Sequence, residues 1–410
     1  MMIFRWLKSK TVREAMALHK YYSRLLAAHR DLLAPQAAGP VQAKLDDLRA
    51  AIVDGPKDRI LARAEELEAA VKKWLPPYPH AAWRENVEVL LVALAVALGI
   101  RTFFLQPFKI PTGSMQPTLF GVTSHNYLAP GENPDTPLPH GWARIKDWFQ
   151  GSSYLDIVAR NDGQIEAIDP PVGIQIINFW QKFRLGGQEY TIWFPPDYGE
   201  APRGLSPLAW RAGLTPEHVY KKGDHIVKLG VNTGDHLLAD RLSYNFRQPA
   251  RGDIIVFETA GIAEDRRRLY GIPGDQFYIK RLVGLPGEKV SIGDDRHVRI
   301  NGRPLDAGTP RFENVYGFNP VQPPRDSQWS GHLNGAMAAK YGGAGGNQLP
   351  MFPDADTVRE VPPDSCLPMG DNTWVSLDSR FWGPLPEKYV LGKAFFVYWP
   401  LSKRFGWGNN

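Results

Sequence analysis

Residues 276–305 read QFYIKRLVGLPGEKVSIGDDRHVRINGRPL, and this stretch decides the fold class of the 410-residue chain. Short runs of β-branched and aromatic residues alternate here with turn dipeptides at Pro286-Gly287, Gly293-Asp294 and Asn301-Gly302. An Asn-Gly pair between such runs is a strong signal for a two-residue hairpin. The stretch therefore predicts successive antiparallel strands.

The same pattern extends along the chain in both directions. Three segments place a Gly-Asp turn before a short apolar strand: GDHIVKL, GDHLLAD and GDIIVFE, beginning at residues 223, 234 and 252. Their unequal spacing indicates shared turn chemistry rather than a structural repeat. Other strands are predicted at YLDIVAR (154–160), GIQIINFW (173–180), EYTIWF (189–194) and FFVYWP (395–400). Residues 306–363 have the composition of a loop-rich insertion.

The N-terminal part differs from this β-rich region. Ala, Leu, Arg, Lys and Glu predominate at 11–33 and 42–75, with apolar residues three and four apart, as in amphipathic helices. Pro and Gly in APQAAGP and DGPKD interrupt them. We therefore expect a helical hairpin of two or three segments within residues 1–83, either self-packed or binding a partner. The apolar run in MMIFRWLKSK is too short for a cleavable signal peptide, so we expect nothing to be removed.

The most apolar stretch follows at residues 84–106. Its uncharged core, 89–100, is shorter than a membrane span and would also suit a buried helix. As a helix, however, 87–105 would extend roughly 28 Å, close to the hydrocarbon thickness of a bilayer. Glu88 and Arg101 would lie near its ends, where they could reach the interface. We therefore predict one transmembrane helix at 84–106.

The charges around this segment predict its orientation. Lys72, Lys73 and Arg84 precede the apolar core, whereas Lys109 is the one basic residue close behind the span, setting aside Arg101 within it. Basic residues favour the cytoplasmic side of a membrane. The helical region is therefore expected in the cytoplasm, and residues 107–410 outside it.

Composition and charge restrict the partners and the kinds of site that the protein can have. A formal net charge of +5 and a sequence pI near 9.1, spread along the chain, favour anionic membrane lipids over nucleic acid as a partner. The single cysteine, Cys366, excludes an intrachain disulfide and a multi-cysteine metal site.

The stretch IPTGSMQPTL (110–119), just after the apolar segment, contains a candidate nucleophile. Gly113 permits a tight turn, and prolines on either side stiffen the loop that carries Ser114. A serine needs a base within hydrogen-bond reach to attack a carbonyl carbon. His225 and His236 lie among acidic residues, but neither has the sequence context of a catalytic triad. The acidic neighbours are Asp224, Asp235 and Asp240.

Lys280 is the alternative base. Strand alternation places Tyr278, Lys280 and Leu282 on one face. If that face is buried, desolvation can lower the lysine pKa by up to about 3 to 5 units, enough for a general base. The opposing interpretation is a lysine paired with a carboxylate at the sheet edge.

The segment MGDNTWVSLDSRFWG (369–383) supplies the third element. Its Gly, Asp, Asn and Ser content predicts a tight loop held by side-chain bonds to the backbone. Ser376 could orient a lysine amine, and Asp378 with Arg380 could brace the loop or form an exposed pair of little energetic value.

In combination and order, these stretches resemble the bacterial type I signal peptidases, which are membrane-anchored leader peptidases with a Ser/Lys dyad. The resemblance implies a signal-peptidase-like β core, with Ser114 as nucleophile, Lys280 as general base, Ser376 orienting that lysine, and Thr112 in the oxyanion hole. It implies a supporting loop with Asp371, Asp378 and Arg380. Apolar pockets for small substrate residues would be formed by Phe108, Ile110, Pro111, Met115, Leu119 and Ile279.

Two features depart from the family pattern. The family loop usually reads Gly-Asp-Asn-Arg, but Thr373 stands here in place of the arginine, so a structural ion pair could be missing. In addition, residues 121–232 intervene before the GDHLLAD strand and form a long β-rich insertion that the compact family core lacks.

The resemblance implies an endopeptidase of the bacterial cytoplasmic membrane that removes signal peptides from secretory preproteins after Ala-X-Ala-like sites. It implies no metal or cofactor and leaves the oligomeric state open. Two alternatives remain: a membrane-anchored β-rich binding protein in which Ser114 and Lys280 are inert, and a self-cleaving Ser/Lys protein of the repressor type. The latter would carry an N-terminal DNA-binding domain, for which the helices lack evident recognition features.

Overall fold

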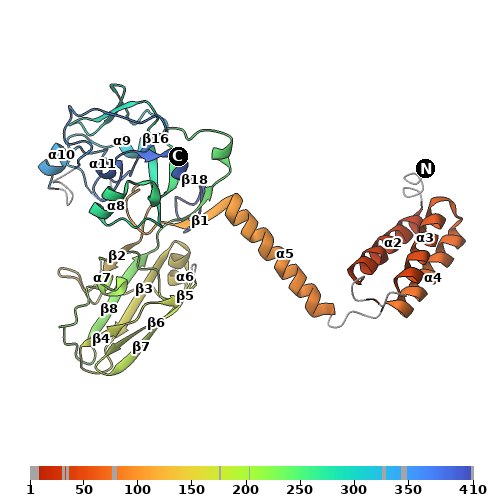
Figure 1. Ribbon diagram of the computed structural model, residues 1–410. Helices are drawn as coiled ribbons and strands as arrows, with labels where there is room; N and C mark the ends of the chain where they lie inside the picture. Colours follow the sequence, from red (N-terminus) through yellow and green to blue (C-terminus); the bar gives the residue numbers. More distant parts are fainter. Residues whose placement is uncertain are drawn as a thin grey trace. The chain divides into compact units, whose positions relative to one another are not determined.

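The computed structural model describes residues 9–29, 33, 37–75, 81–174, 177–202, 204–325, 329–342 and 349–407. The chain divides into two compact units, residues 1–96 and 97–410, which are described separately (Figure 1).

The first unit contains three packed helices, α2 (Lys10–His29), α3 (Ala38–Asp54) and α4 (Lys57–Trp74). The chain leaves α3 at Gly55, whose N–H donates to Ala51 O, and Pro56, with an extended backbone, immediately precedes the first residue of α4. Leu45, Leu48 and Leu67 are fully buried between the helices. The predicted hairpin of two or three segments is thus a three-helix, self-packed bundle.

Helix α5 (Ala81–Phe103) includes a segment, Trp83–Phe103, that is long and apolar enough to cross a membrane. Its mean hydropathy is 1.8, and none of it is buried against the protein. The helix ends before the predicted boundary at 106, because Leu105 and Gln106 already belong to strand β1. Their backbones pair with a strand far along the sequence, so local apolar character did not reveal the boundary.

The second unit is built around one large antiparallel sheet. Its strand order is β1-β9-β18-β10-β11-β16-β17, with β19 added to β18. The strands are β1 (Leu105–Lys109), β9 (His236–Asp240), β18 (Val390–Trp399), β10 (Ile254–Glu258), β11 (Phe277–Gly284), β16 (Ser365–Met369), β17 (Leu385–Pro386) and β19 (Gly406–Trp407). β11 therefore lies inside the sheet, whereas β1 is an edge strand.

A smaller antiparallel sheet continues the stretch that opened the sequence analysis. β12 (Lys289–Ile292), β13 (Val298–Ile300), β14 (Arg303–Pro304) and β15 (Arg359–Glu360) pair in the order β14-β13-β12-β15. Asn301 and Gly302 both have positive φ, at 50° and 84°, which accounts for the Asn-Gly turn between β13 and β14. The predicted antiparallel strands are confirmed.

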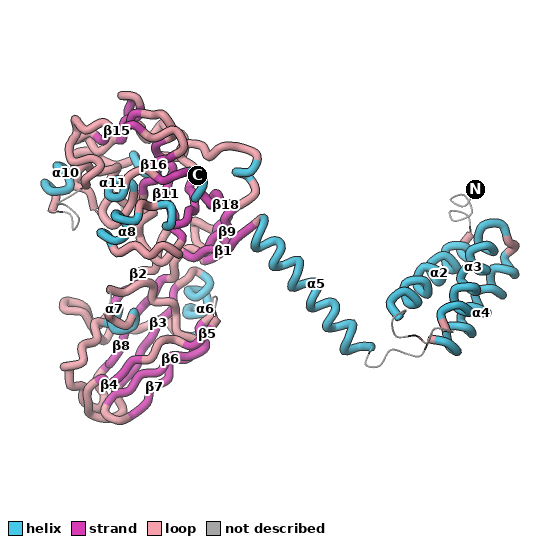
Figure 2. Tube along the Cα trace, viewed as in Figure 1, coloured by secondary structure: helices cyan, strands magenta, loops and turns pink. Residues whose placement is uncertain are grey.

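The chain between β1 and β9 contains a β-sandwich, which we call the insert (residues 123–232). One sheet has the order β2-β8-β3, from β2 (Thr123–Asn126), β8 (His225–Asn232) and β3 (Ser152–Val158). The other contains β4 (Ile165–Ile168), β5 (Val172–Gly173), β6 (Asn178–Leu185) and β7 (Gln188–Trp193). Helices α6 (Gly141–Phe149) and α7 (Pro207–Ala212) complete it. Figure 2 shows its strands as a group apart from the large sheet.

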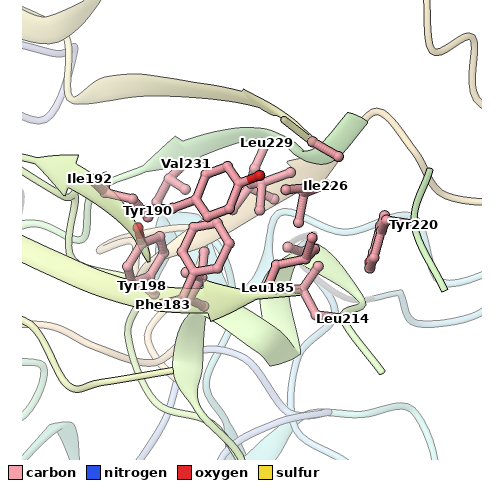
Figure 3. Packing of buried hydrophobic residues seen from close by; sticks show 14 of the residues in the cluster. Phe183, Leu185, Tyr190, Ile192, Tyr198, Leu214, Tyr220, Ile226, Leu229 and Val231 are labelled. Atoms are coloured by element: carbon pink, nitrogen blue, oxygen red, sulfur yellow. The ribbon is translucent and has the colours of Figure 1, made fainter. Parts of the chain in front are cut away.

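The two sheets of the insert enclose their own apolar core. Phe183 and Tyr190, from β6 and β7, stack with ring centroids 4.9 Å apart, while Leu229 and Val231 point inward from β8 (Figure 3). The segment predicted as one strand at 173–180 is instead divided: β5 ends at Gly173 and β6 begins at Asn178. No Gly, Pro, Asn or Asp lies between Ile174 and Ile177, so the division into two strands was not predicted.

The predicted insertion at 306–363 is loop-rich, with the short helices α9 (Glu313–Tyr316) and α10 (Gly335–Lys340). It nevertheless contributes fully buried side chains, including Phe312 and Phe352, to the core beneath the smaller sheet.

Candidate active site

Ser114 and Lys280 meet although 166 residues separate them in the sequence. Ser114 lies in the turn that follows β1, where Gln116 N donates to Gly113 O at 3.1 Å. Lys280 projects from β11, an interior strand between β10 and β16. Its Nζ lies 2.9 Å from Ser114 Oγ, within hydrogen-bond distance. A position inside the sheet is not the edge position that the alternative interpretation of Lys280 required.

The Lys280 amine is almost completely withdrawn from solvent. The residue is 4% exposed, and besides Ser114 its Nζ contacts Ile279 O at 3.1 Å. Burial lowers the pKa of Lys280 from its ordinary 10.5 to about 8, against the opposing effect of the negative charges on Asp378 and Asp371. Because no carboxylate forms an ion pair with Lys280 among the described residues, desolvation dominates, and a small but useful fraction of the amine is neutral at pH 7.

The loop that follows β16 closes the site from the other side. Asn372 N donates to Ser114 O at 3.1 Å, and Asn372 Nδ2 donates to Gly113 O at the same distance. At Gly370 the backbones come so close that an added Cβ would lie 2.1 Å from Ser376 Oγ and 2.5 Å from Ser114 O. The candidate nucleophile is therefore held from two directions, by its own turn and by this loop.

Ser376 occupies the expected loop but does not make the expected contact. Its Oγ is buried and has no hydrogen-bond partner within the described part of the chain. It lies close enough to Asp378 to favour the ionised carboxylate, without the geometry of a hydrogen bond. The structure brings Ser376 beside Gly370, and no hydrogen bond joins it to the Lys280 amine.

A fully buried ion pair connects the three segments. Arg281, next to Lys280 in β11, donates from Nε to Asp371 Oδ1 at 2.8 Å and from Nη2 to Asp371 Oδ2 at 2.7 Å. Thr118, from the Ser114 segment, donates to Asp371 Oδ2 at 2.5 Å. Arg281 thereby contacts all three parts of the site, and sequence reasoning had not selected it. The sequence feature that could have revealed Arg281 is a charged residue in the middle of an apolar strand.

Asp378 and Arg380 form a second buried pair, with Nε 2.9 Å from Oδ1. Burial alone would raise the pKa of Asp378, but the Arg380 guanidinium outweighs this effect and lowers it. Arg380 Nη1 also donates to Thr373 Oγ1 at 2.6 Å, and Leu333 N donates to the same oxygen at 2.9 Å. The threonine that replaces the family arginine is thus hydrogen-bonded to Arg380, and both ion pairs of the loop are present.

Another buried group that sequence reasoning missed is His332, from the 306–363 segment. Its Nε2 lies 3.1 Å from Gly370 O, which fixes Nε2 as the donor, and its Nδ1 then accepts from Tyr316 Oη at 2.9 Å. Burial, together with the charge of Arg380, lowers the pKa of His332 to about 4. His332 is therefore neutral at physiological pH and holds the Gly370 carbonyl from behind. Nothing in the local sequence GHLNG indicates this role.

The remaining predicted residues surround Ser114. Thr112 Oγ1 donates to Ser114 Oγ at 3.4 Å, and Thr112 is exposed. Five of the six predicted pocket residues belong to one apolar cluster: Phe108, Ile110, Met115, Leu119 and Ile279. Ile110, Met115 and Leu119 are buried core residues, so they can shape a pocket only from beneath. Phe108, Ile279 and the sixth residue, Pro111, are partly exposed and can contact a substrate directly.

The histidines weighed as alternative bases lie elsewhere. His225 Nδ1 is 2.7 Å from Asp156 Oδ1 in the insert. His236 is largely buried in β9, and burial lowers its pKa to about 4. Neither forms a hydrogen bond with Ser114. Among the described residues, no cluster of His, Cys, Asp or Glu side chains could hold a metal ion.

Comparisons with known proteins agree on one protein family. The sequence profile described as "Signal peptidase, peptidase S26" matches residues 83–159 and 225–399. The stretch between the two matched parts, residues 160–224, lies within the insert and is shorter than the insertion of 121–232 predicted from the sequence.

Several known proteins are similar to part of this chain. Signal peptidase I of Leptolyngbya laminosa is 33% identical over 174 residues, which is 42% of this chain and 64% of that protein. A probable thylakoidal processing peptidase 2 of Arabidopsis thaliana is 30% identical over 173 residues, 42% of this chain and 35% of the relative. A crystal structure of signal peptidase I from Enterococcus faecalis is 26% identical and covers 36% of this chain and 97% of that one, with a TM-score of 0.22.

Proposed function

The chain belongs to the peptidase S26 family of signal peptidases, and we propose that it is a membrane-anchored serine endopeptidase that removes signal peptides from preproteins. The observation that carries the proposal is the 2.9 Å approach of a buried, readily neutralised Lys280 amine to Ser114 Oγ. A serine hydroxyl is a poor nucleophile until a nearby base accepts its proton, and this amine meets both requirements of distance and pKa.

In the first half of the reaction, neutral Lys280 accepts the Ser114 proton as Oγ attacks the scissile carbonyl carbon. The resulting oxyanion would be stabilised by Thr112 Oγ1 together with the Ser114 N–H. When the C–N bond breaks, the Lys280 ammonium gives its proton to the departing amine, and an acyl-enzyme on Ser114 remains. Water then attacks this ester while Lys280 accepts a proton from the water. When Lys280 passes this proton to Ser114 Oγ, the ester bond breaks and the carboxylic acid is released.

The proposed substrates carry small residues before the cleaved bond, as in Ala-X-Ala. The apolar side chains that flank Ser114 support this preference. Because Ile110, Met115 and Leu119 are packed in the core, the accessible surface is limited to the more exposed Phe108, Pro111 and Ile279. A shallow apolar surface accommodates alanine better than a bulky or charged side chain, which would lose hydration without gaining a partner.

We further propose that α5 anchors the chain in the cytoplasmic membrane of a bacterium. The three-helix bundle (within 1–83) would lie in the cytoplasm, the segment predicted at 84–106 would span the bilayer, and residues 107–410 would lie outside. The basic residues before α5 support this orientation. One residue, Phe104, separates α5 from β1, so the active site would remain close to a bilayer in which the signal peptide itself is embedded. Such confinement raises the effective substrate concentration.

Two substitutions test the proposal. Ser114→Ala and Lys280→Met should each reduce preprotein cleavage by the full-length chain in detergent or vesicles by about a thousandfold or more. Lys228→Met is the matched control, because Lys228 is also buried but belongs to the insert, where its amine donates to Pro134 O. Cleavage that persists in either dyad variant would refute the mechanism. A correctly folded wild-type chain that cleaves no signal peptide would instead favour the binding-protein alternative.

A further inference from the structure

The insert exposes apolar side chains at the point where β5 meets β6. Ile174 and Ile177 exchange both backbone hydrogen bonds, at 2.9 and 3.2 Å, so the chain reverses between them. Ile174 is 60% exposed and Ile177 48%. The sequence from Val172 to Trp180, VGIQIINFW, contains no charged residue. An uncharged, aliphatic hairpin end of this kind is costly to leave in water.

Helix α6 exposes a second apolar set. Trp142, Ile145, Trp148 and Phe149 recur at helical spacing, and no residue of α6 is buried. Trp142 is 79% exposed. The helix is therefore amphipathic with much of its apolar side left exposed, although the Trp148 and Phe149 rings also contact Trp399. We call these four residues, together with Ile174 and Ile177, the apolar rim.

Strand connections place both parts of the apolar rim at one end of the sandwich. At the opposite end, Asn161 follows β3 and donates to Gly186 O, just beyond β6, at 2.6 Å, while Gly163 pairs with Tyr220 ahead of β8. Since β3 and β6 both finish there, both begin at the other end. That end contains the β5–β6 hairpin and α6, which immediately precedes β3, as Figure 1 also shows.

The same end of the insert joins the large sheet. Leu401 N, just after β18, donates to Phe149 O at 2.9 Å, and the Trp148 and Trp399 rings lie 4.9 Å apart. Lys109, at the end of β1, forms an ion pair with Asp197 of the insert at 2.5 Å. The edge strand β1 thus leads from the end of α5 to this junction, a distance of roughly 16 Å at about 3.3 Å per residue.

We propose that the apolar rim enters the interfacial region of the lipid bilayer, giving the catalytic unit a second membrane contact beside α5. The inference rests on the proposed membrane anchor. A lipid surface suits the rim better than a protein partner, because the rim consists of exposed side chains on a helix face and beside a chain reversal rather than of a groove. It combines exposed isoleucines with tryptophan, the side chain most favoured at the membrane interface, and α6 also carries Lys146 for anionic headgroups. Two contacts joined through the edge strand β1 would restrict the movement of the active site relative to the bilayer.

Site-specific labels on the full-length chain in vesicles of phosphatidylcholine and phosphatidylglycerol test the proposal. In a Cys366→Ala background, an environment-sensitive fluorophore is attached at Ile174→Cys or Ile145→Cys, with lipid-borne nitroxide as quencher. The matched control is Val219→Cys, which is 59% exposed but lies beside Tyr220 at the far end of the sandwich. We expect a blue shift and at least about twofold stronger quenching at 174 and 145 than at 219.

A label at Leu94→Cys, on the exposed surface of α5, separates failure of the inference from failure of the anchor. If Leu94→Cys is quenched by deep nitroxide while Ile174→Cys and Ile145→Cys behave like Val219→Cys, the anchor stands and the apolar rim does not contact lipid. The same conclusion follows if the rim labels are protected in native membranes but not in pure lipid, which would indicate a protein partner. If Leu94→Cys is not quenched either, both the membrane insertion of α5 and the lipid contact of the apolar rim are wrong.

Discussion

Arg281 and Asp371 form a two-point ion pair with no exposed side-chain surface, and the pair connects the strand that bears Lys280 to the loop that closes over Ser114. Arg281 also donates to Gly252 O at 3.0 Å and Arg311 O at 2.6 Å. A buried guanidinium with this many hydrogen-bond acceptors holds its strand in place and so restricts the movement of the adjacent residue, Lys280. The position of the Lys280 amine therefore depends on a charge pair that takes no part in the chemistry.

Removing one partner of this pair should be far more harmful than removing both. We expect Asp371→Leu to lower the free energy of unfolding by about 3 to 5 kcal/mol, because an unpaired guanidinium remains buried. The double variant Arg281→Met with Asp371→Leu should recover at least half of that loss. Urea denaturation of the four proteins in the cycle measures the coupling. Additive losses in the double variant would show that the two side chains act independently.

Gly370 is predicted to tolerate no side chain. Gly370→Ala would place a methyl group against Ser376 Oγ and the Ser114 carbonyl oxygen, and the backbone oxygen cannot move without displacing the nucleophile. We expect at least a tenfold loss of cleavage rate and a destabilisation of about 1 to 3 kcal/mol. Gly308→Ala is the control, since its Cβ would meet only a flexible side-chain oxygen at 3.4 Å. Equal activity of the two variants would contradict the close packing around Ser114.

His332 should act by holding the Gly370 carbonyl. His332→Leu leaves two buried polar groups unpaired, at a cost of about 1 to 3 kcal/mol, and should lower kcat about tenfold with little change in KM. His332→Gln keeps a donor at the position of Nε2 and should restore most of the rate. Steady-state kinetics on both variants, each checked for its melting temperature, make the comparison. A glutamine variant as slow as the leucine variant would exclude the hydrogen bond as the cause.

The same histidine predicts sensitivity to acid. Its pKa is lowered from 6.5 to about 4 in the folded protein, so the unfolded chain binds the extra proton between these values. Stability should therefore fall as pH decreases from 6.5 to 4, by roughly 1.4 kcal/mol per pH unit from this group, and should be unaffected by it above pH 6.5. In His332→Gln this part of the loss should disappear, which denaturation at pH 7 and pH 5 can measure.

Periodicity and turn residues were sufficient for much of the fold. The strands around Lys280 were predictable because apolar residues alternate between clear turn dipeptides, whereas the pairing of Ser114 with Lys280 was expected only from the family resemblance. Interactions between distant segments were not predictable. The end of α5 at Phe103 depends on pairing between β1 and β9, and Arg281 and His332 acquire their roles only from buried partners elsewhere in the chain. The hairpin between Ile174 and Ile177 lacks any local turn signal.

Cleavage should become faster with increasing pH. Because burial lowers the pKa of Lys280 to about 8, the neutral base is a minority species at pH 7 and predominates above pH 8. We expect kcat/KM to rise about tenfold from pH 7 to a plateau above pH 9. His332 does not change its protonation state in this range, so the midpoint of the pH dependence of kcat/KM should be unchanged in His332→Gln. A rate that is flat from pH 6 to pH 9 would argue against a lysine base.

The most direct test is the titration of the Lys280 amine itself, followed by NMR of isotopically labelled lysine in the full-length chain, with Lys280→Met to assign the signal. The account predicts a midpoint near pH 8, well below that of the exposed lysines. An amine that remains protonated beyond pH 10 would show that Lys280 cannot accept the Ser114 proton, and the proposed mechanism would be wrong.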